Sequence, residues 1–431
     1  MKTRIKVIGA GFAGAEAAYR LLTEGFSVDL YEMRPNKMTP AHHTGGIAEP
    51  VCSNSFKSKD RATAQGLLKA EMRELDSVVL RAADRSAVPA GGALAVDREL
   101  FSANIQEILL GFPRLRIIRE EAVTIDDYTI VASGPLTSDT LAAEIISLTG
   151  REGLAFYDAA APIVTAESVD MSKAYYMSRY GKGDADYLNC PMSREEYQQF
   201  YQALVSARTV ILKDFEKGDV FEGCLPLEVM AKRGEDTLRF GAFKPVGLSL
   251  EGERAYAVLQ LRKENVQGTL FNLVGCQTNL AFPEQKRVFS LISALKGAEF
   301  VRYGVMHRNT FIDSPALLTE HFNMKERQSV FFAGQLTGVE GYMESAASGI
   351  IAGINMARLV RGEQLLPLPS TTMVGSLARY ISTSSKDFQP MHASFELVPP
   401  LSEKIKDKKQ RKIAYANRAI NDIIKYRAFL K

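Results

Sequence analysis

The sequence of 431 residues contains no tryptophan and only four cysteines, Cys52, Cys190, Cys224 and Cys276. The cysteines are widely spaced and form no Cys-x-x-Cys pair, so neither a disulfide framework nor a zinc site is indicated. We therefore interpret them as free thiols in a reducing, cytoplasmic environment, and we expect no bound metal.

Long apolar runs are also missing. No stretch approaches the roughly eighteen apolar residues of a membrane span, and Met1–Val7 leads into a glycine turn rather than a signal-peptide cleavage site. The motifs of zinc proteases, P-loop NTPases and nucleophile-elbow hydrolases do not occur. We expect a cytoplasmic protein with no membrane partner.

Charge is nearly balanced over the whole chain, with a formal net charge of +3, but it is unevenly distributed. Residues Leu401–Lys431 hold ten Lys or Arg against three acidic residues. Such a basic tail could contact RNA phosphates, or it could be a solvated basic helix. The sequence alone leaves both interpretations open.

The N-terminus has the pattern of a dinucleotide-binding βαβ unit. An apolar strand, Arg4–Ile8, precedes a glycine-rich turn and a helix, Ala15–Thr23. A second strand, Ser27–Tyr31, ends at Glu32, where an acid can bind the ribose hydroxyls of the adenosine half. We expect cofactor contacts from the turn residues Gly9, Ala10, Gly11, Phe12, Ala13 and Gly14.

Each glycine of the turn has a physical role in such a unit. Gly9 makes the tight turn, Gly11 lets the backbone approach a pyrophosphate, and Gly14 permits close packing of helix and strand. The helix N-terminus then offers N–H groups and the positive end of its dipole to the phosphates. We interpret the unit as the binding site of FAD.

Two later segments are expected to return to this cofactor. A strand over Tyr128–Ala132 ends in a Ser-Gly-Pro turn, and a strand over Ser329–Ala333 precedes a glycine-rich segment and a small-residue helix, Glu344–Leu359. Small residues allow close helix packing. The predicted cofactor contacts in the glycine-rich segment are Gly334, Gln335, Gly338, Gly341 and Tyr342.

These patterns predict an α/β fold, with a discontinuous Rossmann-like FAD-binding domain and an inserted α+β domain. We assign residues 1–180 and 313–431 to the FAD-binding domain and residues 181–312 to the insertion. The insertion differs from the rest of the sequence in its mixed strands and proline-rich connections.

Three residues are candidates for chemistry or substrate contact. Cys52 lies in a loop crowded with hydroxyl and amide groups, and Cys224 lies between a glycine and a proline. A cysteine is more often a small buried apolar residue than a nucleophile, but such turns favour reactivity. His307, flanked by polar residues, could stack on a planar ligand or be a structural histidine. Cys190 and Cys276 are interpreted as structural.

Taken together, these motifs resemble those of the folate- and FAD-dependent tRNA (uracil-5-)-methyltransferase family. The similarity extends from the first strand to about Pro400, and its motifs are highly specific. Pro50, Phe56 and Cys276 depart from the residues usual in the family. The matching segments are Gly9–Ala18, Tyr31–Pro35, Met38–His42, Val51–Ser55, Val88–Arg98, Ala185–Met192, Lys244–Leu248, Arg302–Thr310 and Gly338–Ala347.

The resemblance implies formation of 5-methyluridine in the T-loop of tRNA. Methylenetetrahydrofolate would donate the carbon, and FAD reduced by NADPH or NADH would supply the electrons. Two family cysteines carry over as Cys52 and Cys224, and which of them attacks uracil stays open. His307 would help to enclose the folate.

Three alternatives remain at this stage. A related subgroup carries out the same chemistry on 23S ribosomal RNA. A flavin-dependent NAD(P)H oxidoreductase without methyl transfer, or a different flavin-dependent tRNA-modifying enzyme, would need neither folate nor Cys224. A non-catalytic flavoprotein that binds RNA through its basic tail would have no reason to retain both cysteine contexts.

Overall fold

The computed structural model describes residues 4–151, 154–181, 184–210, 225–249, 254–383 and 388–430. Within them, a parallel sheet has the strand order β16-β7-β1-β2-β6. Its strands are β1 (Arg4–Ile8), β2 (Ser27–Tyr31), β6 (Leu115–Ile118), β7 (Thr129–Val131) and β16 (Val330–Phe332).

The strand order explains why the nucleotide-binding unit is discontinuous. Strand β16 comes from the C-terminal half of the chain, yet it pairs with β7, which pairs with β1. The predicted α/β, Rossmann-like class is confirmed, because this sheet is parallel and helices pack around it. The four predicted strands of this sheet, β1, β2, β7 and β16, are confirmed to within one residue at each boundary.

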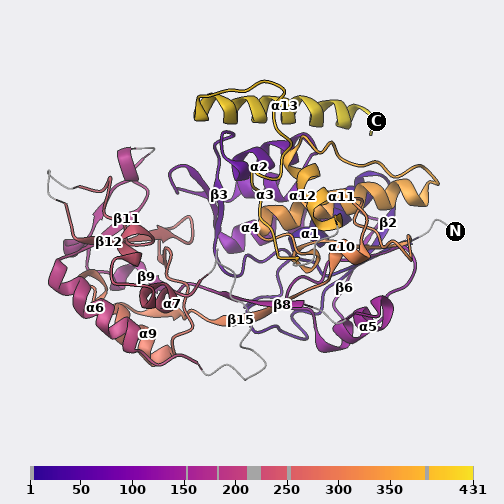
Figure 1. Cartoon of the computed structure of the whole chain (residues 1–431). Helices are drawn as coiled ribbons and strands as arrows, with labels where there is room; N and C mark the ends of the chain where they lie inside the picture. The colour runs from indigo at the N-terminus through magenta and orange to yellow at the C-terminus, as the bar shows by residue number, and fades with distance from the viewer. Residues whose placement is uncertain are drawn as a thin grey trace.

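Helices cover this sheet and a small antiparallel sheet beside it (Figure 1). The small sheet has the order β3-β5-β4 and consists of β3 (Ser55–Ser58), β4 (Ala87–Val88) and β5 (Ala93–Val96). The helices are α1 (Phe12–Thr23), α2 (Ala64–Glu74), α3 (Val78–Arg85), α4 (Arg98–Leu110), α5 (Asp139–Thr149), α10 (Ser314–Leu317), α11 (Tyr342–Val360), α12 (Met373–Ser382) and α13 (Lys408–Ala428).

Helices α1 and α11 pack closely because α11 is rich in small residues, as expected from its sequence. A Cβ atom added at Gly349 would lie 2.1 Å from the carbonyl oxygen of Ala13. Any larger residue at this position would push the two helices apart. The close approach fixes the start of α11 next to the glycine turn that precedes α1.

A second sheet, antiparallel throughout its described strands, has the order β10-β11-β12-β13-β9-β14. Its strands are β9 (Ile163–Thr165), β10 (Tyr175–Tyr176), β11 (Leu188–Met192), β12 (Ala257–Lys263), β13 (Leu270–Leu273) and β14 (Phe300–Arg302). Helices packed with it include α6 (Arg194–Ser206), α7 (Leu227–Lys232), α8 (Thr237–Phe240) and α9 (Phe282–Phe289).

The molecule consists of two units, each with its own large buried core (Figure 1). The core of the second sheet begins at Val164 and ends at Ala298. Strands β8 (Leu154–Ala159) and β15 (Met306–Phe311) pair with each other and connect this unit to the rest. We therefore propose that the inserted unit, called the second unit below, runs from about Ile163 to Arg302; the boundaries at residues 180 and 312 stay a prediction.

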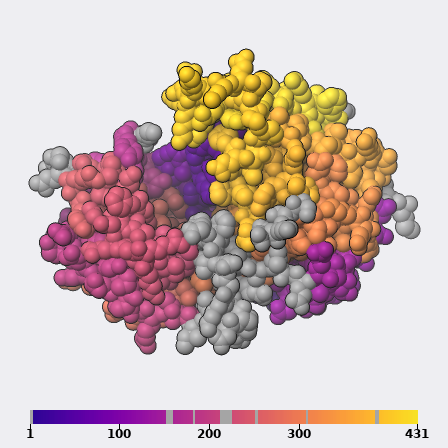
Figure 2. Space-filling view, viewed as in Figure 1, coloured from indigo at the N-terminus to yellow at the C-terminus, as the bar shows by residue number. Residues whose placement is uncertain are grey.

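The basic tail forms the long helix α13, which packs on α2. Its buried residues are Ala416, Ala419, Ile423 and Tyr426, so one face is apolar and fixed. Most of its basic residues are exposed. Figure 2 shows this segment (yellow) along the upper rim, with a recess between it and the second unit (magenta). No helix among the described residues is long and apolar enough to cross a membrane.

Candidate functional site

A cleft with about 1120 Å³ of empty space, partly open to solvent, lies at the carboxyl ends of the parallel strands. This is the position at which sheets of this topology bind dinucleotides. Of the predicted cofactor contacts, the cleft is lined by Gly9, Gly11, Phe12, Ala13, Glu32, Gly334, Gln335 and Tyr342.

The glycine turn has the geometry that the sequence predicts. Gly9 has a φ of +94°, and a Cβ atom there would lie 2.4 Å from the oxygen of Ala132. A Cβ at Gly14 would lie 1.8 Å from the oxygen of Gly9. A Cβ at Gly11 would meet nothing within 4 Å, because Gly11 faces the cleft at the start of α1. Gly11 therefore leaves room for a ligand rather than for protein.

The remaining predicted contacts, Ala10, Gly14, Gly338 and Gly341, do not line the cleft. Ala10 is fully buried, and its N–H donates to Glu32 over 3.1 Å. Gly338 and Gly341 have φ values of +82° and +117°, so both satisfy turn geometry, and Gly341 immediately precedes α11. These residues shape the site, and direct contact with a cofactor remains a prediction for them.

The carboxylate of Glu32 is already held by protein groups. It accepts hydrogen bonds from the Ala10 N–H and from the backbone N–H, Nε and Nη2 of Arg34, over 2.9 to 3.1 Å. Burial would raise the pKa of Glu32, but the bonds and charge of Arg34 outweigh it and lower the pKa. Glu32 is therefore a fixed anion at the cleft wall, and its contact with a ribose stays a prediction.

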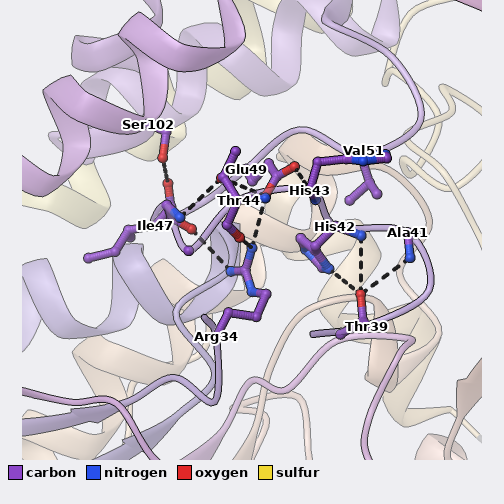
Figure 3. Close-up of polar contacts among 12 residues, drawn as sticks. Arg34, Thr39, Ala41, His42, His43, Thr44, Ile47, Glu49, Val51 and Ser102 are labelled. Atoms are coloured by element: carbon purple, nitrogen blue, oxygen red, sulfur yellow. Dashed lines mark hydrogen bonds and ion pairs between the residues drawn. The ribbon is translucent and has the colours of Figure 1, made fainter. Parts of the chain in front are cut away.

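Arg34 connects this wall to the loop that precedes Cys52 (Figure 3). Its Nη1 donates to the Thr44 carbonyl over 3.2 Å and to Glu49 over 3.1 Å, and its Nη2 also donates to the Gly46 carbonyl over 3.1 Å. With the two bonds to Glu32, all five guanidinium N–H groups have acceptors. Arg34 is 2% exposed, so this network fixes the loop rigidly.

Cys52 lies in the same cleft as the glycine turn. Its Sγ is 3.1 Å from the Tyr342 hydroxyl oxygen, which also accepts the Cys52 backbone N–H over 2.8 Å. Burial, followed by the proximity of Cys52, raises the pKa of Tyr342 well above its usual value. Tyr342 therefore stays a neutral phenol that can share a proton with the thiol.

Aromatic rings pack against Tyr342, the partner of Cys52. Phe12 stacks on Tyr342 with ring centroids 4.6 Å apart, and Phe56 meets both rings edge-on. Phe56, one of the positions that depart from the family pattern, is 2% exposed and fills this cluster.

A buried amide in the cleft suits a polar ligand. Asn309 on β15 lines the cleft and is 1% exposed, and within the described part of the chain neither its Nδ2 nor its Oδ1 has a hydrogen-bond partner. Leaving such a group unpaired costs about 1 to 3 kcal/mol, so a bound molecule with its own donor and acceptor would relieve it. Together with the glycine turn, Asn309 makes the cleft a fitting site for FAD or another heteroaromatic ligand.

Comparisons with known proteins agree with this geometry. Residues 4–364 match the family described as glucose inhibited division protein A. The chain is 56% identical to methylenetetrahydrofolate--tRNA-(uracil-5-)-methyltransferase TrmFO of Bacillus pumilus, over 98% of each chain. It is 57% identical to the TrmFO of Heliobacterium modesticaldum, over 98% of each chain, and 56% identical to that of Bacillus subtilis, over 97%.

The chain belongs to the TrmFO/Gid family. A solved structure of Aquifex aeolicus GidA shares the fold, with a TM-score of 0.73 over 99% of this chain and 73% of that chain. Its sequence identity is only 16%, so this likeness concerns the fold alone. The predicted family resemblance is confirmed.

Two residues that the TrmFO/Gid resemblance singles out are not placed by the structure. Cys224 lies outside the described residues, so its distance from Cys52 is untested. The backbone of His307 lies in β15, opposite Asp158, but its side chain is outside the described part. Cys190 and Cys276 are fully buried, and burial raises the pKa of Cys190 to about 12, as suits structural thiols.

The sequence reasoning missed several polar residues of this TrmFO/Gid site. Arg34 and Glu49 gave no periodic signal, because they lie in an irregular loop and meet only after folding. Asn309 gave a weak signal that was not used, since asparagine is uncommon in strands and its presence in one suggests a role.

Proposed function

We propose that this protein methylates C5 of a uridine in the T-loop of tRNA, with methylenetetrahydrofolate as carbon donor and FAD as cofactor. The observation that carries the proposal is the meeting of Cys52 and the dinucleotide-binding turn in one cleft. The names of relatives 55 to 57% identical over nearly the full chain support the substrate and the donor. The reaction would take place in the cytoplasm, where tRNA is found.

The residues of the cleft suit the parts that this reaction needs. Gly11 and the start of α1 would hold the pyrophosphate of FAD, and Glu32 would lie near its ribose. Reduced FAD supplies the electrons that convert a methylene group into a methyl group, with NADPH or NADH as the source. Asn309 offers one donor and one acceptor to a ring bound in the cleft.

A cysteine makes C5 of uracil reactive. A thiolate that adds to C6 places the electron pair of the C5–C6 double bond on C5 and O4, so C5 can attack the one-carbon unit. Loss of the C5 proton and departure of the thiolate then restore the ring. Cys52 and Cys224 are the candidates, and Tyr342 is placed to hold or return a proton at the Cys52 sulfur.

One assay tests the function directly. Purified protein with FAD is incubated with methylenetetrahydrofolate, NADPH and either unmodified tRNA or unmodified ribosomal RNA, and 5-methyluridine is read by mass spectrometry. We expect methylation at one T-loop uridine, lost when folate is omitted. Methylation of ribosomal RNA instead, or NADPH oxidation without any methylation, would contradict the proposal.

A further inference from the structure

The second unit contacts the loop that carries Cys52, defined here as residues 49–54. Arg302 on β14 donates through Nη2 to the Val51 carbonyl over 2.8 Å and to the Ala41 carbonyl over 3.2 Å. Arg262 on β12 donates to Asn54 Oδ1 over 2.8 Å and to Ser53 Oγ over 3.0 Å. The residues on both sides of Cys52 are thus bound by arginines of the other unit.

A third arginine, on the nucleotide-binding unit, also connects the two units. Arg98, the first residue of α4, donates through Nη1 to the carbonyls of Pro50 and Val51, the latter over 3.1 Å. Its Nε donates to Glu264 of the second unit over 2.6 Å. The carbonyl of Val51 therefore accepts from Arg98 and Arg302 together, directly before Cys52.

Backbone contacts reinforce the same junction. Asn54 Nδ2 donates to the Lys263 carbonyl over 3.0 Å, and Asp97 accepts the Val266 N–H over 3.1 Å. The loop is therefore held in a fixed register against β12 and the turn that follows it. Moving the second unit would move the backbone of Cys52.

The arginines of the junction differ in whether a carboxylate pairs with them. Glu264 pairs with Arg98, and Glu49 is taken by Arg34. Among the residues that the structure describes, no carboxylate lies within ion-pair distance of Arg262 or Arg302, although Arg262 is only 5% exposed. Burial lowers the pKa of both arginines and outweighs the opposing charge of Glu264.

An arginine held close to a thiol favours the thiolate form. Although burial opposes the charge of Arg98, Glu264 outweighs it, and Cys52 and Tyr342 add to the rise in the pKa of Arg98. An interaction that favours a charged arginine beside a thiolate must favour the thiolate equally. Cationic neighbours are the usual means by which proteins make a cysteine nucleophilic.

We propose that Arg98, Arg262 and Arg302 are positioning residues that hold the Cys52 loop against the cleft and favour the thiolate form of Cys52. The reactivity of the thiol then depends on the docked second unit. This proposal rests on the proposed function in one respect, because the proposed methylation is what requires a reactive Cys52. It can nevertheless be tested without methylation.

The test is alkylation of Cys52 by iodoacetamide in the FAD-bound protein without RNA, followed by mass spectrometry of the Cys52 peptide. Rates are measured between about pH 6 and pH 9, where a thiol of ordinary reactivity titrates. Other charged or titratable groups facing this loop also shape the profile, so all variants are compared with the same background. These groups are His43, Glu49, Glu264 and Tyr342.

Arg302→Met should slow alkylation at neutral pH about tenfold and shift the profile to higher pH, because one pKa unit is a tenfold change in thiolate. Arg302→Lys keeps the charge and should stay within about threefold of the unchanged protein. Arg239→Met is the matched control. Arg239 also belongs to the second unit, but it donates to Asp236 and to the Tyr256 carbonyl and not to the Cys52 loop.

Rates and profiles that agree within about twofold for Arg302→Met and the Arg239→Met control would overturn the proposal. If Arg302→Met does not fold, Arg302→Gln keeps an amide donor for the Val51 carbonyl without the charge and is expected to give the same slowing. If the unchanged protein does not methylate tRNA, the proposed function fails. The alkylation rates would still decide whether the arginines favour the thiolate of Cys52.

Discussion

Replacing Gly11 by valine separates ligand binding from folding, because the residue faces the cleft and not the protein. Its φ of −75° is open to any L-residue, and an added Cβ meets no protein atom within 4 Å. Replacing a favourable residue at the position before a helix costs roughly 0.5 to 2 kcal/mol of folding free energy. We therefore expect Gly11→Val to fold and to unfold at nearly the same temperature.

The same substitution should nearly abolish FAD binding. A valine side chain would occupy the space where a pyrophosphate approaches the N–H groups at the start of α1. Losing two hydrogen bonds to a charged group, at about 1.5 to 3 kcal/mol each, weakens binding by at least about a hundredfold. The measurement is titration of the flavin-free protein with FAD by fluorescence, together with the flavin content after purification.

Two other glycines serve as controls. Gly92 is exposed, also lacks any atom within 4 Å of an added Cβ, and lies outside the cleft, so Gly92→Val should leave FAD binding unchanged. Gly14→Ala should instead disrupt folding itself, because its Cβ would overlap the oxygen of Gly9. Full flavin occupancy in Gly11→Val, with an unaltered dissociation constant, would show that the dinucleotide does not bind at this turn.

Further outcomes follow from the same site. Cys52→Ser and Cys224→Ser should each keep the fold and FAD but lose at least about a hundredfold in methylation, and RNA containing 5-fluorouracil should trap only one of the two cysteines; near-normal turnover would remove that cysteine from the mechanism. Asn309→Ala should weaken FAD or folate binding about tenfold, and equal affinities would leave its unpaired amide unexplained. His307→Ala should weaken use of folate or NADPH with FAD still bound, and unchanged kinetics would make the residue structural. If the tail binds RNA phosphates, replacing its basic residues by glutamine should flatten the salt dependence of tRNA affinity. An unaltered slope would leave the tail a solvated surface. The residues to replace by glutamine are Lys404, Lys406, Lys408, Lys409, Arg411 and Lys412.

The nucleotide-binding half was predictable because its requirements are local. Gly9 needs a positive φ, Gly14 needs an absent side chain, and both follow a short apolar strand. These constraints act over a few residues, so the sequence pattern carries them directly. The helix α11 was predictable for the same reason, since its small residues reveal a helix packed against another backbone.

The start of the second unit was harder to predict. Strand β9 has only three residues and pairs with β13 and β14, more than a hundred positions further along the chain. A segment this short has no periodicity that could assign it to one sheet or the other. Only the long-range pairing shows that it belongs to the second core.

The arginines around Cys52 illustrate why a site can be only partly visible in a sequence. Cys52 was found from its polar loop and its family motif, which are local features. Arg98 lies 46 positions away and Arg302 lies 250 positions away. Both stand in segments that match the family, but the match does not show which groups they contact. Their role depends on a carbonyl that both must reach, that of Val51. A thiol can therefore be recognised as a candidate nucleophile from sequence, whereas the charges that would make it one are supplied by the fold.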